Sequence, residues 1–335
     1  MPVQSLPRSA DRYARDQRAE IGAAVSAVRR QWRRMGPEFD ESYRVIEPVL
    51  LDVVMTAQER VAAGAQEYVP AVLEETGQVR AVEPRARVST SPLVGVAGDG
   101  RPLDSLLYEA VIGARVAVSE GATASQALAE RSRWLTLAVG TVLSDTARQS
   151  ESLAMGVRPV GGYVRMLNPP SCSRCAILAG KWFRKNQGFQ RHPGCDCRHI
   201  PASESIGDDL TVNPLEYFES LSPAEQDRIF TKAGAEAIRN GADISQVVNA
   251  RRGMRTAQIG GRDVLVTLEG TTRRGWAYRH LTPANQRGTD IRLAGERYRR
   301  TRRPRLMPET IQQVAKDRED YLRLLRANGY LRPTL

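Results

Sequence analysis

The sequence predicts an α+β protein with a mostly helical N-terminal half, a small α+β module stapled by cysteine and histidine, and a helical, basic C-terminal region. Apolar residues recur at helical spacing through most of the first 155 positions, and the period changes to two after Gly161-Gly162. All four cysteines lie between residues 172 and 197. We expect four regions, at 1–75, 76–103, 104–210 and 211–335.

The composition is typical of a globular protein. Charged residues make up 26% of the 335 positions and hydrophobic residues 41%. No apolar run reaches the ~18 residues that a membrane-spanning helix needs, so we expect no membrane partner. Residues 1–18 lack the apolar core of a signal peptide. The expected compartment is therefore a reducing cytoplasm, where clustered cysteines favour a metal over disulfides.

Helices are expected at residues 10–35, 48–63 and 68–75 of the N-terminal half. In the first of these, one face carries Ile21, Ala24, Val25, Val28, Trp32 and Met35. Residues 76–102 are rich in Gly, Pro, Ser and Thr and predict a linker or exposed loop. Helices resume at 104–119, and the capping box from Thr123 to Gln126 starts another that continues towards Met155.

The strand pattern is confined to short segments. Residues 163–167 alternate and predict a strand, and residues 198–200 predict its return partner. Ser222, Pro223 and Glu225 have the form of a helix start, and Asn240-Gly241 that of its end. Residues 262–268 predict a further strand, and residues 308–327 a final helix.

The cysteine segment offers five candidate metal ligands for the four positions of a structural zinc site. Cys172 and Cys175 form a Cys-x2-Cys pair, and His192 and Cys195 repeat this spacing, with Cys197 two residues further on. We favour Cys172, Cys175 and Cys195, completed by either His192 or Cys197. Because four protein ligands leave no open position for water, a bound Zn²⁺ would be structural.

Three other interpretations of the cysteines stay open at this point. A thioredoxin-like redox pair would account for Cys172 and Cys175 but not for the second pair. Disulfides between the two halves would need an oxidising compartment, such as an extracellular particle. The thiols could also simply be packed together.

The positive charge is large and uneven. The formal net charge is +11, which favours a polyanionic partner such as nucleic acid. Residues 12–34 contain seven arginines, and residues 292–305 contain seven against a single acid. The second group predicts contacts with phosphates or an acidic protein, unless it is a solvated loop; its members are Arg292, Arg297, Arg299, Arg300, Arg302, Arg303 and Arg305.

Catalytic signatures are weak. His280 is the only histidine distant from the cysteine segment, and it could pair with Ser220, Ser222 or another serine. No Gly-x-Ser-x-Gly elbow marks a nucleophile, and neither a Walker loop nor a His-Glu-x2-His motif is present. The sequence therefore favours a protein without catalysis.

Residues 163–201 resemble the Mu F-like minor head proteins of tailed bacteriophages. That family has a strand, a Cys-x2-Cys pair, a short apolar-Gly stretch, a basic loop and His-Pro-x-Cys-x-Cys before a second strand. The matching positions are Cys172 to Cys175, Leu178 to Gly180, His192 to Cys197 and Ile200-Pro201, with Asp196 where the family commonly has arginine. Residues 221–254 and 303–330 are similar to minor head proteins of actinobacterial phages, often labelled as capsid maturation proteases fused to a Mu F-like part.

The resemblance implies a low-copy capsid component that is made in the host cytoplasm and lies inside the virion near the portal. Its expected partners are the portal protein, the major capsid or scaffolding protein, and packaged double-stranded DNA bound without sequence preference. Two alternatives stay open: a capsid maturation protease, and a DNA-processing enzyme supported by zinc.

Overall fold

The computed structural model describes residues 6–78, 84, 86, 88–167, 171–188, 195, 197–204, 213–269, 276–281 and 300–332, with the backbone alone for residues 300–302. The chain divides into two compact units, residues 1–169 with 179–211 and residues 170–178 with 212–335. The predicted α+β class is confirmed, since long helices are combined with two three-stranded sheets in the described part. Residues 170–178 belong to the second unit, although they lie inside the region expected at 104–210.

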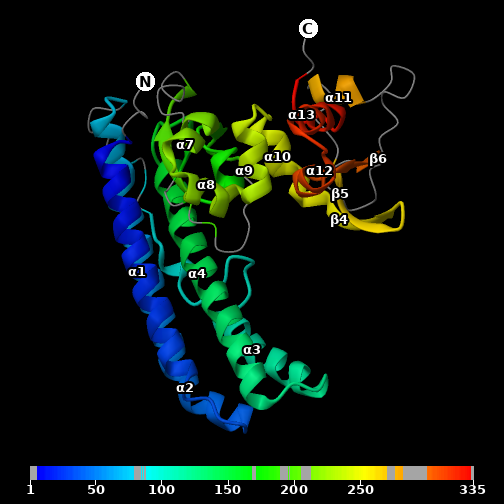
Figure 1. The fold of residues 1–335 in the computed structure, drawn as a ribbon. Coiled ribbons are helices and arrows are strands. Elements are labelled where there is room, and N and C mark those ends of the chain that lie inside the picture. Colours follow the sequence, from blue (N-terminus) through cyan, green and yellow to red (C-terminus); the bar gives the residue numbers. More distant parts are fainter. Residues whose placement is uncertain are drawn as a thin grey trace. The chain divides into compact units, whose positions relative to one another are not determined.

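Four long helices build most of the first unit. They are α1 (Arg8–Trp32), α2 (Phe39–Glu75), α3 (Leu103–Ser119) and α4 (Ala124–Gly156), and α2 packs against the other three. Figure 1 shows α1 and α4 as long neighbouring helices. Their inward faces form one apolar core that includes Val28, Trp32, Ile46, Leu50, Leu107, Leu135, Val139 and Leu143. The capping box predicted at Thr123 is present, and α4 starts directly after it.

The two helices expected at 48–63 and 68–75 are one continuous helix, α2, which passes through Pro48 and Pro70. A proline inside a helix costs about 3 kcal/mol, because it removes a hydrogen bond and crowds the preceding turn. The apolar stripe continues across both prolines, with Ile46 and Leu50 around the first and Val69 and Val72 around the second, all of them buried. Burial of this stripe offsets the loss, so the prediction of a break was wrong.

The segment expected to be a linker is held against the first unit. It contains the short 3-10 helix η1 (Ser91–Leu93). The buried side chain of Gln58 donates to the carbonyl oxygens of Leu93 (3.1 Å) and Val96 (2.9 Å) and accepts from the Gly95 N–H (2.8 Å). One glutamine of α2 therefore satisfies three backbone groups of this loop.

A three-stranded antiparallel sheet completes the first unit. Its order is β2 (Trp182–Arg184), β1 (Gly162–Met166) and β3 (Arg198–Ala202), with Val164 opposite Ile200. Both predicted strands are thus confirmed. A second apolar cluster joins the sheet to the helices through Tyr13, Tyr68, Val72, Met155, Tyr163 and Ile200.

The second unit consists of short helices around another antiparallel sheet. Its helices are α5 (Ser173–Ala176), α7 (Pro214–Ser220), α8 (Pro223–Phe230), α9 (Lys232–Arg239), α10 (Ile244–Ala250), the 3-10 helix η3 (Arg251–Gly253), α11 (Trp276–Leu281), α12 (Pro308–Val314) and α13 (Arg318–Ala327). The sheet order is β4 (Met254–Ile259), β5 (Arg262–Glu269) and β6 (Arg300–Leu306). Gly260 and Gly261 join β4 to β5 with φ of 59° and 75°, values that glycine adopts easily.

Two predicted helices of this unit are each divided. The helix starting at Ser222 ends at Phe230, and α9 begins after Thr231, whose φ of 67° is strained for a β-branched residue. The Thr231 hydroxyl accepts from the Gly234 N–H (3.3 Å), which gives the new helix its cap. The final helix is interrupted likewise, because Asp317 caps α13 by accepting from the Asp320 N–H (2.8 Å).

Strand β6 lies within the arginine-rich segment that sequence patterns indicated as a possible loop. It pairs with β5, which places Arg305 opposite Thr267 and Leu306 opposite Val266. The Leu306 N–H donates to Oδ1 of Asn328 (2.7 Å), and so α13 also holds the strand. None of the helices in the described part of the chain combines the length and low polarity needed to cross a bilayer.

We expect Gly162→Ala to destabilise the first unit by about 1–3 kcal/mol. A Cβ at Gly162 would lie 2.6 Å from the Trp182 ring and would overlap the Phe183 carbonyl oxygen, so the pairing of β1 with β2 must shift. Thermal unfolding checks this prediction. Gly161→Ala is the matched control, because a Cβ there meets its nearest atom at 3.8 Å. Equal melting temperatures of the two variants would contradict the prediction.

Candidate metal centre

The predicted cysteines are positioned by the ends of β1 and β3. Cys195 and Cys197 immediately precede β3, and Cys175 lies on α5, in the connection from β1 to β2. In β1 and β3, Arg165 is opposite His199 and Met166 is opposite Arg198. The start of β3 therefore lies at the end of β1, which leads into the first cysteine pair.

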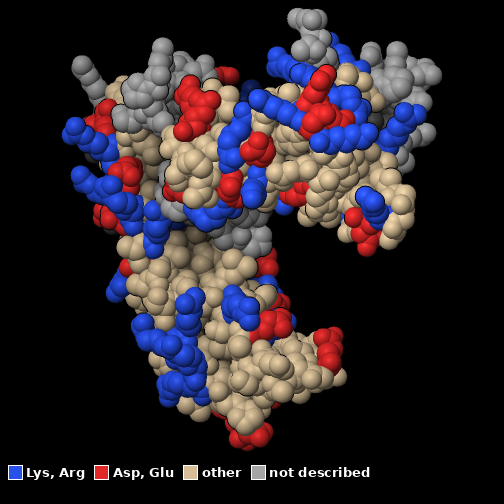
Figure 2. Space-filling view, viewed as in Figure 1, with Lys and Arg blue, Asp and Glu red and all other residues tan. Residues whose placement is uncertain are grey.

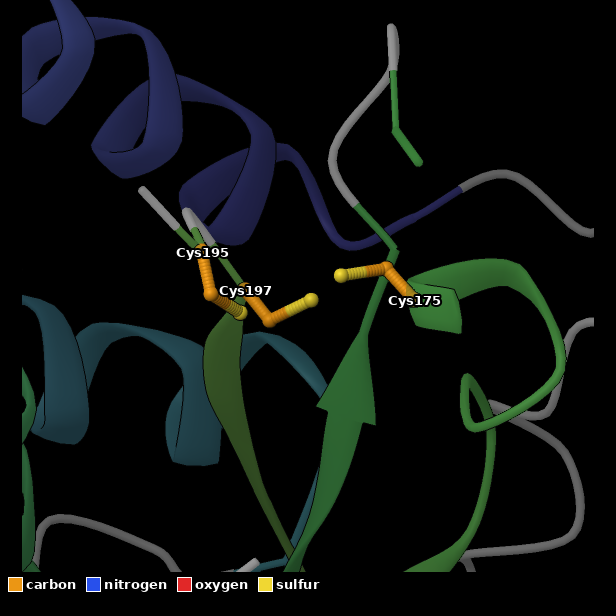
Figure 3. Close-up of side chains that lie close together, drawn as sticks. All are labelled: Cys175, Cys195 and Cys197. Carbon is orange, nitrogen blue, oxygen red and sulfur yellow. The ribbon is translucent and has the colours of Figure 1, made fainter. Parts of the chain in front are cut away.

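Three of the cysteines converge. The Sγ atoms of Cys175, Cys195 and Cys197 all lie within 4.8 Å of one another, and the three side chains are buried. Figure 3 shows the sulfur of Cys175 facing that of Cys197, with Cys195 beside it. A tetrahedral zinc with Zn–S bonds of about 2.3 Å holds its sulfurs about 3.8 Å apart. The group could therefore hold a metal ion with only small side-chain movements.

The other two predicted ligands have different outcomes. Cys172 is exposed and is not one of the three converging cysteines; its sulfur accepts the Cys175 N–H (3.4 Å) and caps α5. His192 lies outside the described residues. Cys197, which the sequence left as an alternative to His192, is thus one of the three converging cysteines, because the start of β3 brings Cys195 and Cys197 in together. No disulfide joins any two of the four cysteines.

A buried arginine contacts two of the sulfurs. Nη2 of Arg165 lies 3.5 Å from the Sγ of Cys197 and 3.7 Å from that of Cys195, and its side chain is 1% exposed. A guanidinium stays charged in proteins, and a cation beside a thiol favours the thiolate, the form that binds metals. Arg165 therefore favours metal binding by these two sulfurs over their packing as neutral thiols.

A second buried arginine fixes the backbone of the cysteine pair. Nη1 of Arg148, on α4, donates to the carbonyl oxygens of Cys195 (2.9 Å) and Cys197 (3.0 Å). Its Nη2 donates to Oδ1 of Asp145 (2.8 Å), which lies one turn earlier on the same helix. Arg148 thus ties the Cys-x-Cys turn to the four-helix core.

One turn further along α4, Glu151 holds the start of β3. Its carboxylate accepts from the Tyr13 hydroxyl (2.9 Å) and the His199 backbone N–H (3.2 Å), and Nδ1 of His199 lies 3.0 Å away. The Tyr68 hydroxyl donates to the His199 carbonyl oxygen (2.7 Å). Residues of α1, α2 and α4 therefore share one buried polar network with β3.

Opposing effects set the pKa of Glu151. Complete burial raises the pKa, but the hydrogen bond and charge of His199, followed by the charge of Arg198, outweigh burial and lower it below its ordinary value. Burial also raises the pKa of Tyr13 and Tyr68 well above the usual value. The carboxylate is thus an anion with neutral hydroxyl neighbours, and it offsets the charge of the buried Arg198.

Sequence reasoning missed Arg148, Glu151 and Arg165. Each sits in a regular helix or strand pattern and contacts partners at least 30 residues further along the chain, so spacing carries no sign of its contact. The one usable signal was the placement of charged residues at core-facing positions of α4 and β1.

The predicted nucleic-acid-binding arginines have different outcomes. Arg292, Arg297 and Arg299 lie outside the described residues, and Arg300 and Arg302 contribute backbone to β6. Arg303 is exposed.

Arg305 has an internal role, which corrects its assignment to nucleic acid. Its side chain is 4% exposed and donates to the carbonyl oxygens of Asn328 (3.1 Å) and Glu269 (3.4 Å), and the guanidinium lies 5.2 Å from the centre of the Tyr330 ring. Since these contacts hold β6 and α13 together, this guanidinium does not face a solvent-borne phosphate.

The residues considered for catalysis have structural contacts. Nε2 of His280 lies 3.1 Å from the Arg326 carbonyl oxygen. The hydroxyl of Ser222 caps α8, and that of Ser220 donates to the Tyr217 carbonyl oxygen (2.7 Å). No nucleophile–base pair is formed by these three side chains.

Comparisons of the chain with protein-family models, curated proteins and solved structures found no match. Functional assignment therefore depends on the three-cysteine centre and the distribution of charge.

We expect Glu151→Gln to lower the free energy of unfolding at pH 7 by about 2–4 kcal/mol, because the Tyr13 hydroxyl and the His199 N–H lose a charged acceptor. The native pKa of Glu151 is lowered, so its stabilisation is complete above the unfolded pKa of about 4.3 and is lost as the pH falls through the lower native value. The gap between wild type and variant should shrink at acidic pH. Urea unfolding between pH 7 and 3 measures it, with exposed Glu67→Gln as control, and a gap independent of pH would oppose the prediction.

We expect Arg165→Gln to weaken metal binding about 10–100-fold, because the thiolates of Cys195 and Cys197 lose their charged hydrogen-bond donor. Titration with Co²⁺, followed by its absorption bands, measures the affinity. Arg184→Gln is the matched control, since Arg184 lies on the same sheet and is exposed. Equal Co²⁺ affinity of the two variants would rule out this role, and Arg165→Lys should recover part of the loss.

Proposed function

We propose that the three-cysteine centre binds a structural Zn²⁺ and that the chain is a minor head protein of a tailed bacteriophage. The convergence of Cys175, Cys195 and Cys197 is the observation that carries the proposal. Thiolates are the ligands that structural zinc sites use most. The fourth ligand would be Cys172, three residues before Cys175, or His192, three residues before Cys195.

A structural role for the metal is supported by the surroundings of the sulfurs. Three buried thiolates leave one coordination position of a tetrahedral zinc. Cys172 and His192 lie in the same segment of the sequence and are the candidates to fill it. Zinc would join the β1–β2 connection to the start of β3. The metal's contribution is to cross-link these segments.

The head-protein role is supported by the cysteine pattern of residues 172–197, which resembles Mu F-like proteins, and by the net charge of +11. An arginine-rich protein beside densely packed DNA contacts phosphates without reading sequence. We propose that the chain is made in the host cytoplasm and enclosed in the head near the portal. There it would contact the portal protein, the major capsid or scaffolding protein, and double-stranded DNA.

For the metal, we expect the purified full chain to contain one zinc ion by elemental analysis. A strong chelator should lower its melting temperature by about 10 °C. Cys175→Ser should lose the metal, whereas Cys172→Ser should keep it only if His192 is the fourth ligand. Absence of zinc together with an unchanged melting temperature in chelator would contradict the zinc assignment.

The head assignment is tested by locating the chain in purified virions. Protease should digest it only after the capsids are opened, and quantitative mass spectrometry should find few copies relative to the major capsid protein. Full digestion on intact particles, or absence from virions, would contradict the proposal. Specific cleavage of the major capsid protein by the purified chain would instead support the maturation protease.

A further inference from the structure

The two halves of α1 differ in how their charges are neutralised. In the first half, Asp11 pairs with Arg15, and Glu20 pairs with Arg60 of α2. From Ile21 to the end of the helix no acid is present, and the last two turns with the residues that follow carry Arg29, Arg30, Arg33 and Arg34. We call these four residues the arginine face.

All four side chains of the arginine face are exposed. None forms an ion pair with a described acid; the one contact is from Nη1 of Arg34 to the amide oxygen of Gln31 (2.9 Å). The next acids along the chain are Glu38, Asp40 and Glu41, and Asp40 is itself paired with Arg115. Figure 2 shows Lys and Arg side chains gathered where α1 ends and α2 begins.

The backbone beneath the arginine face is held firmly. Val28, Trp32 and Met35 are buried in the core of the first unit, and the Trp32 indole N–H donates to the Leu128 carbonyl oxygen (3.0 Å). Arg29 and Arg33, like Arg30 and Arg34, are four residues apart, so like charges are neighbours on a helix that cannot turn them away. A cation near a helix C-terminus is favourable, but four uncompensated ones exceed what that end of the helix can neutralise.

We infer that the arginine face binds the phosphate backbone of duplex DNA. Arg29 and Arg34 are five residue steps apart, about 7.5 Å at the rise of an α-helix, and a duplex carries roughly four phosphate charges in that length. The large apolar side chains exposed on the described chain include none from α1. A protein partner would need an apolar or aromatic anchor, whereas a phosphate backbone needs only cations.

The inference rests on the proposed function for its partner, packaged DNA, and adds a surface far in sequence from residues 292–305. It also predicts how the chain contacts DNA. The guanidiniums extend from a rigid helix, so the surface binds any sequence with similar affinity and releases DNA as salt increases.

The experiment measures the affinity of the full chain for a mixed-sequence duplex at several salt concentrations. Changing Arg29, Arg30, Arg33 and Arg34 to Gln should reduce the slope of log affinity against log salt by about 3–4 and weaken binding at least tenfold. The matched control changes Arg15, Arg60, Arg239 and Arg323 to Gln; each of these is paired with an acid, and the net charge falls equally. The control should retain most of the wild-type slope.

Equal slopes for the two quadruple variants would overturn the inference, as would a wild-type chain that does not bind duplex. Competition by polyglutamate as effective as that by duplex of equal charge would also overturn it, since an acidic protein would then be the better partner. These outcomes leave the zinc content and the virion location untouched, so failure of this surface is distinguishable from failure of the proposed function.

Discussion

The first unit depends on two buried side chains of α4 that hold the backbone before and within β3. Arg148 donates to two carbonyl oxygens of the cysteine turn, and Glu151 accepts a backbone N–H two residues beyond Cys197. Both groups are charged, and a charge in the interior is tolerated only where hydrogen bonds and opposite charges compensate it. Asp145, Tyr13 and Arg198 provide that compensation.

This arrangement explains how Cys195 and Cys197 are held close to one point. Buried backbone carbonyls need hydrogen-bond donors, and Arg148 supplies them to Cys195 and Cys197. Arginine suits this task better than lysine, because one planar guanidinium reaches both carbonyls and still contacts an acid. Arg165 donates to the sulfurs of the same two cysteines. Side chains of α4 and β1 therefore hold Cys195 and Cys197 in position without a metal.

The excess of positive charge therefore has two distinct uses. Arg148, Arg165, Arg198 and Arg305 are buried and bind groups of the chain itself. The arginines at the end of α1 are exposed and without acidic partners among the described residues. A count of charges does not separate these groups, although only the second is accessible to a polyanion.

The sequence by itself determined the elements whose signals are local. The capping boxes at Thr123 and Ser222, the apolar stripe of α1 and the alternation in β1 act within a few residues, so α1, β1 and the starts of α4 and α8 were predictable. The spacing of the cysteines likewise indicated a metal centre. Tertiary structure alone decided the continuity of α2 through two prolines, the pairing of β6, and the convergence of Cys197 with Cys175 and Cys195. It also selected the buried charged residues around the site, because their energies come from burial and from partners tens of residues away in sequence, which no local pattern records.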